Sequence, residues 1–276
     1  MNINWGLLVV IYLFLAGMAG GVYFTAAMYD LFDHTKKEII RKGYKIALWL
    51  QLIAVLFLIF DLEQPARFIH MMFTFKFFSP MSIGSWCLLL FGMTAFVTVA
   101  ANSEGALKPL GSFFLKILPY KTILIVGTAL SVFLAAYTGV LLGETTSTLW
   151  SATPFLGALF LASGISCGAC LLLLLETDDP EFTRKGKLFD SLCLIVEIAI
   201  ILFFVLALTI GYGPYPETKA LFSGLYGVMF IGGGVVLGAI VPIIINMSGA
   251  KGKLAPALVL LGAFFLRYAI VFAGQQ

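Results

Sequence analysis

Long apolar runs alternate with short polar connections along the whole chain. A helix needs about 20 apolar residues to cross the ~30 Å hydrocarbon layer of a bilayer. Runs of about that length or more occur at 7–29, 44–62, 82–101, 122–143, 149–175, 188–211, 220–246 and 254–274. The pattern predicts an all-α polytopic membrane protein, with eight transmembrane helices in a single integral membrane domain over residues 1–276.

The composition agrees with this pattern and limits where chemistry can occur. Of the 276 residues, 61% are hydrophobic and only 11% are charged, whereas soluble domains carry roughly a quarter charged residues. The first apolar run is too long for the core of a signal peptide, so we expect it to remain as a helix. The eight helices use nearly the whole chain. Any catalytic module in the water phase must therefore be another polypeptide.

The distribution of cations predicts the orientation in the membrane. Lys and Arg in short loops are retained on the cytoplasmic side. With the N-terminus outside, the outer loops hold only Arg67, Lys76 and Lys219. The cytoplasmic loops then hold Lys36, Lys37, Arg41, Lys42, Lys45, Lys108, Lys116, Lys121, Arg184, Lys185, Lys187, Lys251 and Lys253. We therefore predict that the N-terminus and the C-terminus both lie outside, in a cytoplasmic (inner) membrane.

Polar and amphipathic groups from several helices are predicted to meet in one layer near the outer surface. At 1.5 Å per residue, Asp61 lies ~25 Å from the cytoplasmic edge of the second helix, and Tyr137 reaches a similar height in the fourth. Tyr12 follows after about two turns of the first helix, and Trp86 after about one turn of the third. Each alone would pass as an interfacial residue or a helix end. Their convergence favours a binding pocket.

The connection after Asp61 adds charge beside this layer, in the sequence Asp-Leu-Glu-Gln-Pro-Ala-Arg-Phe that contains Glu63 and Arg67. Carboxylates next to Tyr hydroxyls and an indole N–H suit an amphipathic molecule with a polar head and an apolar tail. A quinone is such a molecule. Its two-electron reduction needs two protons, which carboxylates at the water edge can relay.

A second set of ionisable residues lies deeper. Glu197 stands near the middle of the sixth helix, Asp190 lies two turns below it, and Arg267 is more than halfway out along the eighth. Ionisable groups at such depth face the bundle interior and often serve proton or ion pathways. A proton path through these three residues is one interpretation. The alternative is a neutral Glu that only bonds a neighbouring helix.

The sequence lacks the ligand residues that several kinds of cofactor need. A membrane cytochrome b needs axial histidines within helices, and the two histidines, His34 and His70, both fall in predicted loops. Cys167 and Cys170 have CxxC spacing but lack the second pair that a zinc or iron-sulfur site would need. We therefore expect neither haem nor a metal site. Glycine pairs spaced by four residues, such as Gly164 and Gly168, indicate close helix packing.

Taken together, these residues resemble the membrane subunits of the polysulfide reductase family, often called NrfD-like. The segments that carry the resemblance are 15–21, 61–68, 79–86, 137–143 and 266–275. The resemblance implies a haem-free quinone-reactive anchor built as two four-helix bundles. It also implies a partner subunit like a four-cluster ferredoxin and a molybdopterin catalytic subunit, with iron-sulfur clusters and molybdopterin held only by those partners.

The resemblance also implies roles for individual residues. In the family, a Tyr that corresponds to Tyr137 bonds the quinone head group, and the acidic segment that corresponds to Asp61 and Glu63 lies beside the pocket. Some members have a quinone-binding His and Asn early in the first helix. This protein has Tyr12 and Val9 there, so the contacts to the head group differ on that side.

The leading hypothesis is a membrane subunit of an oxidoreductase, not a complete enzyme alone, that exchanges electrons between menaquinone or another quinone and an iron-sulfur partner on the outer face. Tyr137 and Tyr12 would contact the quinone, Asp61 and Glu63 would exchange protons, and Trp86 or Arg67 would shape the pocket. Two alternative functions remain open at this point. A secondary transporter would place broken helices at matched positions in two halves of the sequence, and a passive anchor would bind no quinone.

Overall fold

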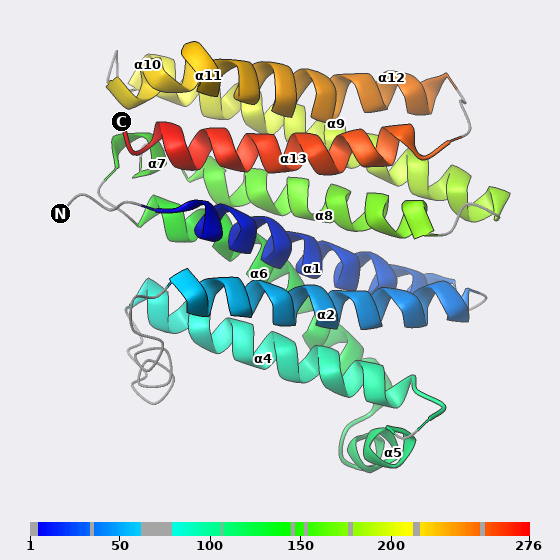
Figure 1. The fold of residues 1–276 in the computed structure, drawn as a ribbon. Coiled ribbons are helices and arrows are strands. Elements are labelled where there is room, and N and C mark those ends of the chain that lie inside the picture. The colour runs from blue at the N-terminus through cyan, green and yellow to red at the C-terminus, as the bar shows by residue number, and fades with distance from the viewer. Residues whose placement is uncertain are drawn as a thin grey trace.

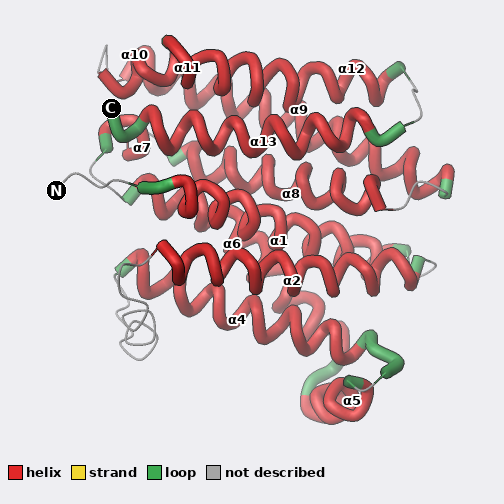
Figure 2. Tube along the Cα trace, in the orientation of Figure 1, coloured by secondary structure: helices red, strands yellow, loops and turns green. Residues whose placement is uncertain are grey.

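The structure is a computed structural model, and it describes residues 5–33, 36–61, 79–105, 107–144, 147–151, 154–175, 179–211, 216–248 and 252–276. Eight of its helices are long and apolar enough to cross a membrane, which confirms the predicted all-α polytopic fold. Within the described ranges no strand is present (Figure 2). The two ends of the described chain lie at the same end of the helices (Figure 1), called here the termini side.

The long helices lie side by side along roughly one direction (Figure 1). Their bounds are α1 Leu7–Phe32, α2 Lys37–Asp61, α4 Pro80–Ala101, α6 Tyr120–Gly143, α8 Phe155–Leu175, α9 Pro180–Gly211, the composite seventh span Gly224–Met247, and α13 Leu254–Ala273. The shorter helices are α5 Lys108–Ile117, α7 Thr148–Ser151 and α10 Pro216–Phe222.

Helices α2 and α9 begin earlier than predicted, at Lys37 and Pro180 rather than at 44 and 188. Two other spans begin later than predicted. The fifth span begins at Phe155 and not at 149, because Pro154 lies in a turn before it and residues 148–151 form the separate helix α7. Proline disfavours helical backbone in the residue before it, so a helix boundary falls there. The seventh span begins at Gly224, where φ is +57°. Only glycine adopts this left-handed conformation without strain, and it separates the span from α10.

Helix α1 lies in the middle of the molecule. It packs against α2 and α6 on one side and against α8 and α13 on the other. Helix α4 packs against α2 and α6, the seventh span packs mainly against α13, and α8 contacts α1, α6, α9 and α13. Helices α2 and α9 bury little of their surface. They therefore present apolar faces to the surrounding lipid.

The contact between α1 and α8 brings backbone against backbone. A Cβ added at Gly21 would overlap the carbonyl of Gly164, and a Cβ at Gly168 would overlap Gly21 itself. Small residues allow this approach, since lipid supplies no hydrophobic drive and helices associate through van der Waals packing. The spacing of four residues between Gly164 and Gly168 thus serves packing, as the sequence indicated.

Part of the seventh span is not a regular α-helix. Between α11 (Gly224–Gly227) and α12 (Val241–Met247), residues Val228–Ile240 form a π-helix, η1. At its end the N–H of Val241 bonds the carbonyl of Val236, five residues earlier. Pro242 lies in the first turn of α12, and it has no N–H to donate to a further π-helical turn. The π-helix therefore ends, and α12 begins, one residue before this proline.

The described chain ends are bound to each other on the termini side. The backbone N–H of Trp5 donates to Oε1 of Gln275 over 2.8 Å, and Nε2 of Gln275 donates to the Trp5 carbonyl over 3.2 Å. The indole of Trp150 lies 5.2 Å from that of Trp5, centroid to centroid, and donates to the carbonyl of Ile270. These contacts join α1, α7 and α13.

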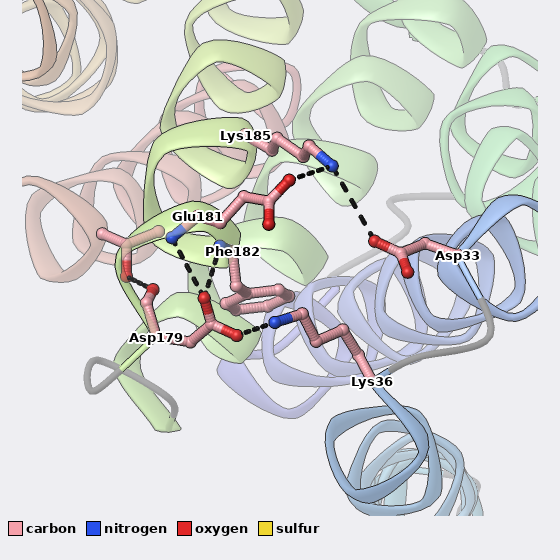
Figure 3. A network of polar contacts seen from close by, with 7 residues as sticks. Asp33, Lys36, Asp179, Glu181, Phe182 and Lys185 are labelled. Atoms are coloured by element: carbon pink, nitrogen blue, oxygen red, sulfur yellow. Dashed lines mark hydrogen bonds and ion pairs between the residues drawn. The ribbon is translucent and has the colours of Figure 1, made fainter.

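Ion pairs join loops on the opposite side (Figure 3). Lys36, between α1 and α2, pairs with Asp179, whose other oxygen accepts the N–H groups of Glu181 and Phe182 at the start of α9. The Lys36 ammonium lowers the pKa of the Asp179 carboxyl. Lys185 pairs with Glu181 over 2.7 Å and lies 3.8 Å from Asp33. The beginning of α2 is thereby held against the beginning of α9.

Helix α5 was not predicted, because residues 108–121 were assigned to a loop. It packs against α4 on the opposite side and is seen nearly end-on, below the end of α4, in Figure 1. Leu110, Phe113 and Ile117 are exposed on it, together with Lys108 and Lys116. Apolar and basic groups on one short helix are typical of a helix at the membrane interface.

We expect Gly168→Ala to destabilise the protein more than Gly143→Ala. The new methyl at position 168 would overlap the Gly21 backbone, whereas at position 143 the nearest atom is the Trp150 carbonyl oxygen at 3.5 Å. Overpacking of this kind costs about 1–3 kcal/mol. Thermal unfolding of the purified variants, followed by fluorescence, measures the difference. Equal melting temperatures would contradict the close α1–α8 contact.

Candidate functional site

A group of hydroxyl and thiol side chains lies near the termini side, inside the contact of α1, α4 and α6. Tyr12 of α1 and Tyr137 of α6 are 1% and 5% exposed, and Cys87 of α4 is also buried. All three lie within electrostatic range of one another. The structure therefore brings Tyr12 and Tyr137 together, although they are far apart in the sequence.

The start of α4 fixes the position of Tyr137. The Tyr137 hydroxyl donates a hydrogen bond to the Pro80 carbonyl in the first turn of α4. A Cβ at Gly84 would collide with the Tyr137 ring and hydroxyl, so a residue without a side chain is needed one turn further on. The ring stacks on Phe133 with centroids 6.1 Å apart. The segment from Ser79 to Trp86 thus forms the surface against which Tyr137 packs.

A tyrosine hydroxyl that donates its one proton can still accept hydrogen bonds through its lone pairs. With its proton directed at Pro80, the Tyr137 oxygen is an acceptor toward any further polar group. The buried Tyr12 hydroxyl adds another donor and acceptor nearby. The pair can therefore fix the polar head of a mostly apolar molecule.

The remaining predicted residues of this site are placed only in part. Asp61 is the last residue of α2 and half-buried, and its Oδ1 lies 3.7 Å from where a Cβ at Gly6 would be. It is therefore level with the start of α1, about 9 Å along the helix from Tyr12. Trp86 is half-buried on α4. Glu63 and Arg67 lie outside the described residues.

A second polar group surrounds Arg267, whose side chain is fully buried. Its guanidinium donates to the Ser163 hydroxyl and the Ala263 carbonyl, both over 3.1 Å, and to the Phe160 carbonyl over 3.3 Å. It lies 4.9 Å from the centroid of the Phe160 ring, within the range of a cation–π contact. A methyl at Gly17 would come within 3.0 Å of this guanidinium. Space on α1 is thus needed to accommodate the cation.

Two carboxyl groups continue from Arg267 toward the opposite side. Glu197, 5% exposed, approaches the same Ser163 hydroxyl closely enough to interact with it. Asp190 accepts hydrogen bonds from the Ser166 hydroxyl over 2.7 Å and from the Asn246 amide over 3.1 Å. Ser163 and Ser166 lie one turn apart on α8, so one helix serves both carboxyl groups. The three predicted residues therefore lie along α8 in two separate hydrogen-bonded groups, Arg267 and Glu197 at Ser163 and Asp190 at Ser166.

Sequence reasoning missed the neutral members of both groups. Ser163, Ser166 and Asn246 gave no signal, because single small polar residues are common in membrane helices. Cys87 also gave no signal in the sequence, and it is a free thiol in the structure. Among the described residues, no group of three or more His, Cys, Asp or Glu side chains could hold a metal ion.

The comparisons with known proteins agree on one group of relatives. The family model described as polysulphide reductase, NrfD matches residues 1–276. The protein is 31% identical to the NrfD homolog of Haemophilus influenzae, over 99% of its own length and 95% of that relative. It is 28% identical to NrfD of Escherichia coli, over 99% and 96%. It is also 28% identical to the C chain of polysulfide reductase from Wolinella succinogenes, over 99% and 95%.

We expect Arg267→Lys to destabilise the protein although it keeps the charge. A lysine ammonium cannot span both Ser163 and the Phe160 carbonyl as the planar guanidinium does, and the loss should be about 1–3 kcal/mol. Lys253→Met, an exposed change before the same helix, is the control. Thermal unfolding of both purified variants checks this. An unchanged melting temperature for Arg267→Lys would show that the contacts do not hold the helices together.

Proposed function

Because the protein belongs to the polysulphide reductase NrfD family, we propose that it is the haem-free, quinone-reactive membrane subunit of a respiratory oxidoreductase complex. The observation that carries this proposal is the buried pair of Tyr12 and Tyr137 beside the start of α4. It offers hydrogen-bonding groups in an apolar surrounding near one membrane edge. A molecule with a polar ring and a long apolar tail needs both.

Tyr137 is proposed to contact the quinol or quinone head group directly. Its hydroxyl donates to the Pro80 carbonyl, so its oxygen can accept a hydrogen bond from a quinol hydroxyl without rearrangement. For a quinone carbonyl, the same proton would have to turn away from Pro80. This geometry suits menaquinol, or another quinol, better than its oxidised form. Tyr12 would contact the ring from α1.

Oxidation of one quinol releases two electrons and two protons, and the protein must supply a route for the protons. Asp61 lies at the end of α2, at the edge of the membrane-spanning part. We infer that Asp61, with Glu63 two residues later, accepts the protons and passes them to water. Trp86 and Arg67 would shape the mouth of the pocket or the surface where a partner docks.

Electrons would pass to or from an iron-sulfur partner on the outer face, since the eight spans use most of this sequence. The partner is proposed to resemble a four-cluster ferredoxin, with a molybdopterin subunit carrying out the terminal reaction. One relative is described as the C chain of polysulfide reductase, which supports membership of a multi-subunit complex. The terminal substrate would then be recognised by the other subunit.

A transporter is supported less well. Matched broken helices in two halves would be its signature. The irregular stretch η1 lies in the seventh span, and the corresponding third span, α4, is a continuous α-helix. A passive anchor gives no reason for the two buried tyrosine hydroxyls of the first site.

We expect Tyr137→Phe in the assembled complex to raise the quinol KM, or lower the quinol-linked turnover, by about three- to tenfold. The substitution removes one hydrogen bond to the head group, worth about 0.5–1.5 kcal/mol. Tyr226→Phe, in the seventh span, is the matched control. Measuring quinol-linked turnover as a function of quinol concentration gives both constants for each variant. Unchanged constants for Tyr137→Phe would remove this residue from the mechanism.

We also expect the purified complex to show no haem b signal from this subunit. Axial ligation needs histidines within the helices, and the sequence places its two histidines at positions 34 and 70, outside the spans. A dithionite-reduced minus oxidised absorbance spectrum is the measurement. A b-type band that follows this subunit through purification would refute the haem-free assignment.

The buried ionisable residues Arg267, Glu197 and Asp190, placed along α8, support a second candidate role, in proton movement across the membrane. If it conducts protons, Glu197→Gln should reduce the proton response of vesicles that contain the complex by tenfold or more, while quinol oxidation without a gradient stays within about twofold. The Gln keeps the size of the side chain and its contact with Ser163. A pH-sensitive dye inside the vesicles reports the response. If neither quantity changes, Glu197 is structural.

A further inference from the structure

A groove with a volume of about 750 Å³ lies between α2 and α4. Its walls are almost wholly apolar, and it opens on the outer surface of two membrane-spanning helices. Lys45 and Leu107 mark one end of it, and Val55 and Leu88 the other. It is therefore open to molecules that diffuse within the bilayer.

One polar side chain lines this groove toward the end at Leu88. Gln51 is 1% exposed, and its Nε2 donates to the Leu88 carbonyl of α4 over 3.4 Å. Its Oε1 has no hydrogen-bond partner among the described residues. A buried amide oxygen without a donor is costly, by about 1–3 kcal/mol. A ligand with a donor group would remove this cost.

The groove has room at its centre. Gly92 lies on the α4 wall, and a Cβ built there meets no atom within 4 Å. This distinguishes Gly92 from glycines such as Gly84 and Gly111, where a Cβ would overlap a neighbouring group. The absence of a side chain at position 92 therefore widens the groove and does not serve helix packing.

The dimensions favour one class of occupant. The groove extends about 15 Å along α2 from Lys45 to Val55, with Gln51 about 9 Å from Lys45. A phospholipid with its phosphate at Lys45 would place an acyl tail beside Gln51, and an acyl tail has no hydrogen-bond donor. A prenylated quinol carries a hydroxyl on an apolar body. It can satisfy Gln51 and leave its tail along the apolar walls.

We propose that this groove is a second quinol site, in which a ring hydroxyl donates to Oε1 of Gln51 and the prenyl tail lies along α2 and α4. The identity of the ligand rests on the function proposed above. The groove is distinct from the first site but adjacent to it, because Leu88 at its end follows Cys87 directly. Gln51 lies about 15 Å along α2 from Asp61. Quinol bound here is held for transfer to the Tyr12–Tyr137 site and is not itself oxidised.

The test uses the intact complex in lipid nanodiscs and a naphthoquinol with a photoreactive diazirine on its prenyl tail. Labelled peptides are identified by mass spectrometry. We expect labelling of residues 45–55 and 88–99 that is stronger for the reduced than for the oxidised probe, since only the quinol donates to Oε1. Excess unlabelled menaquinol should compete for it.

Two variants test the groove, and two serve as controls. Gln51→Leu removes the acceptor while keeping the size, and should lower groove labelling about three- to tenfold. Gly92→Leu fills the open space and should lower it at least as much. Gly232→Leu, where a Cβ meets only a Val228 methyl at 3.9 Å, should leave it unchanged. Tyr137→Phe should lower quinol turnover and leave groove labelling intact.

The outcomes separate this site from the proposed function. Normal quinol turnover without groove labelling, or labelling that Gln51→Leu does not affect, would overturn the second site and leave the first intact. Labelling that anionic phospholipid displaces and menaquinol does not would identify a lipid site and also overturn the proposal. Groove labelling in a complex that does not oxidise or reduce quinol would instead refute the proposed function.

Discussion

The backbone contact between α1 and α8 is the constraint on which the rest of the structure depends. In a bilayer the lipid tails are as apolar as the side chains, so the helices must be held by close packing. At Gly21, Gly164 and Gly168 nothing separates the two backbones, and the depth and rotation of α1 are fixed as a result. Residues above and below this contact then have defined positions. Tyr12 faces α4 and α6, whereas Gly17 makes room for the guanidinium from α13.

The tyrosine pair and the Arg267 group have different surroundings, and the surroundings of each suit its depth in the membrane. Tyr12 and Tyr137 lie near an edge and combine apolar rings with a single hydroxyl, so they tolerate an apolar ligand beside them. Arg267 lies deeper and is surrounded by carbonyls, a serine hydroxyl and the Phe160 ring. Protein groups thus replace water at the two terminal nitrogens of the guanidinium, whereas its Nε has no hydrogen-bond partner among the described residues. The tyrosine pair is therefore suited to binding and releasing a ligand, and the Arg267 group to making fixed contacts within the protein.

The sequence was sufficient for the fold and for the shared level of several residues along the helices. Apolar runs gave the eight spans, and helix rise gave depths that placed Asp61, Tyr12 and Tyr137 toward one side. It could not give rotation, because helices such as α8 are apolar on all faces and show no amphipathic stripe. Three features depend on which face of each helix is turned toward its neighbours. They are the contacts of Ser163 with Arg267 and Glu197, the packing of Tyr137 against Gly84, and the groove at Gln51. The π-helix η1 depends on hydrogen-bond register, which hydropathy does not encode.

The ion pairs between Lys36 and Asp179 and among Asp33, Glu181 and Lys185 are partly exposed to water. Dissolved salt screens such pairs, with a Debye length of about 8 Å at physiological ionic strength. The glycine contacts inside the membrane contain no charge and are insensitive to salt. Among the described residues, the ion pairs all lie at one end of the helix assembly. Raising the ionic strength therefore weakens the link between the start of α2 and the start of α9, while the packing around Tyr12 and Arg267 stays fixed.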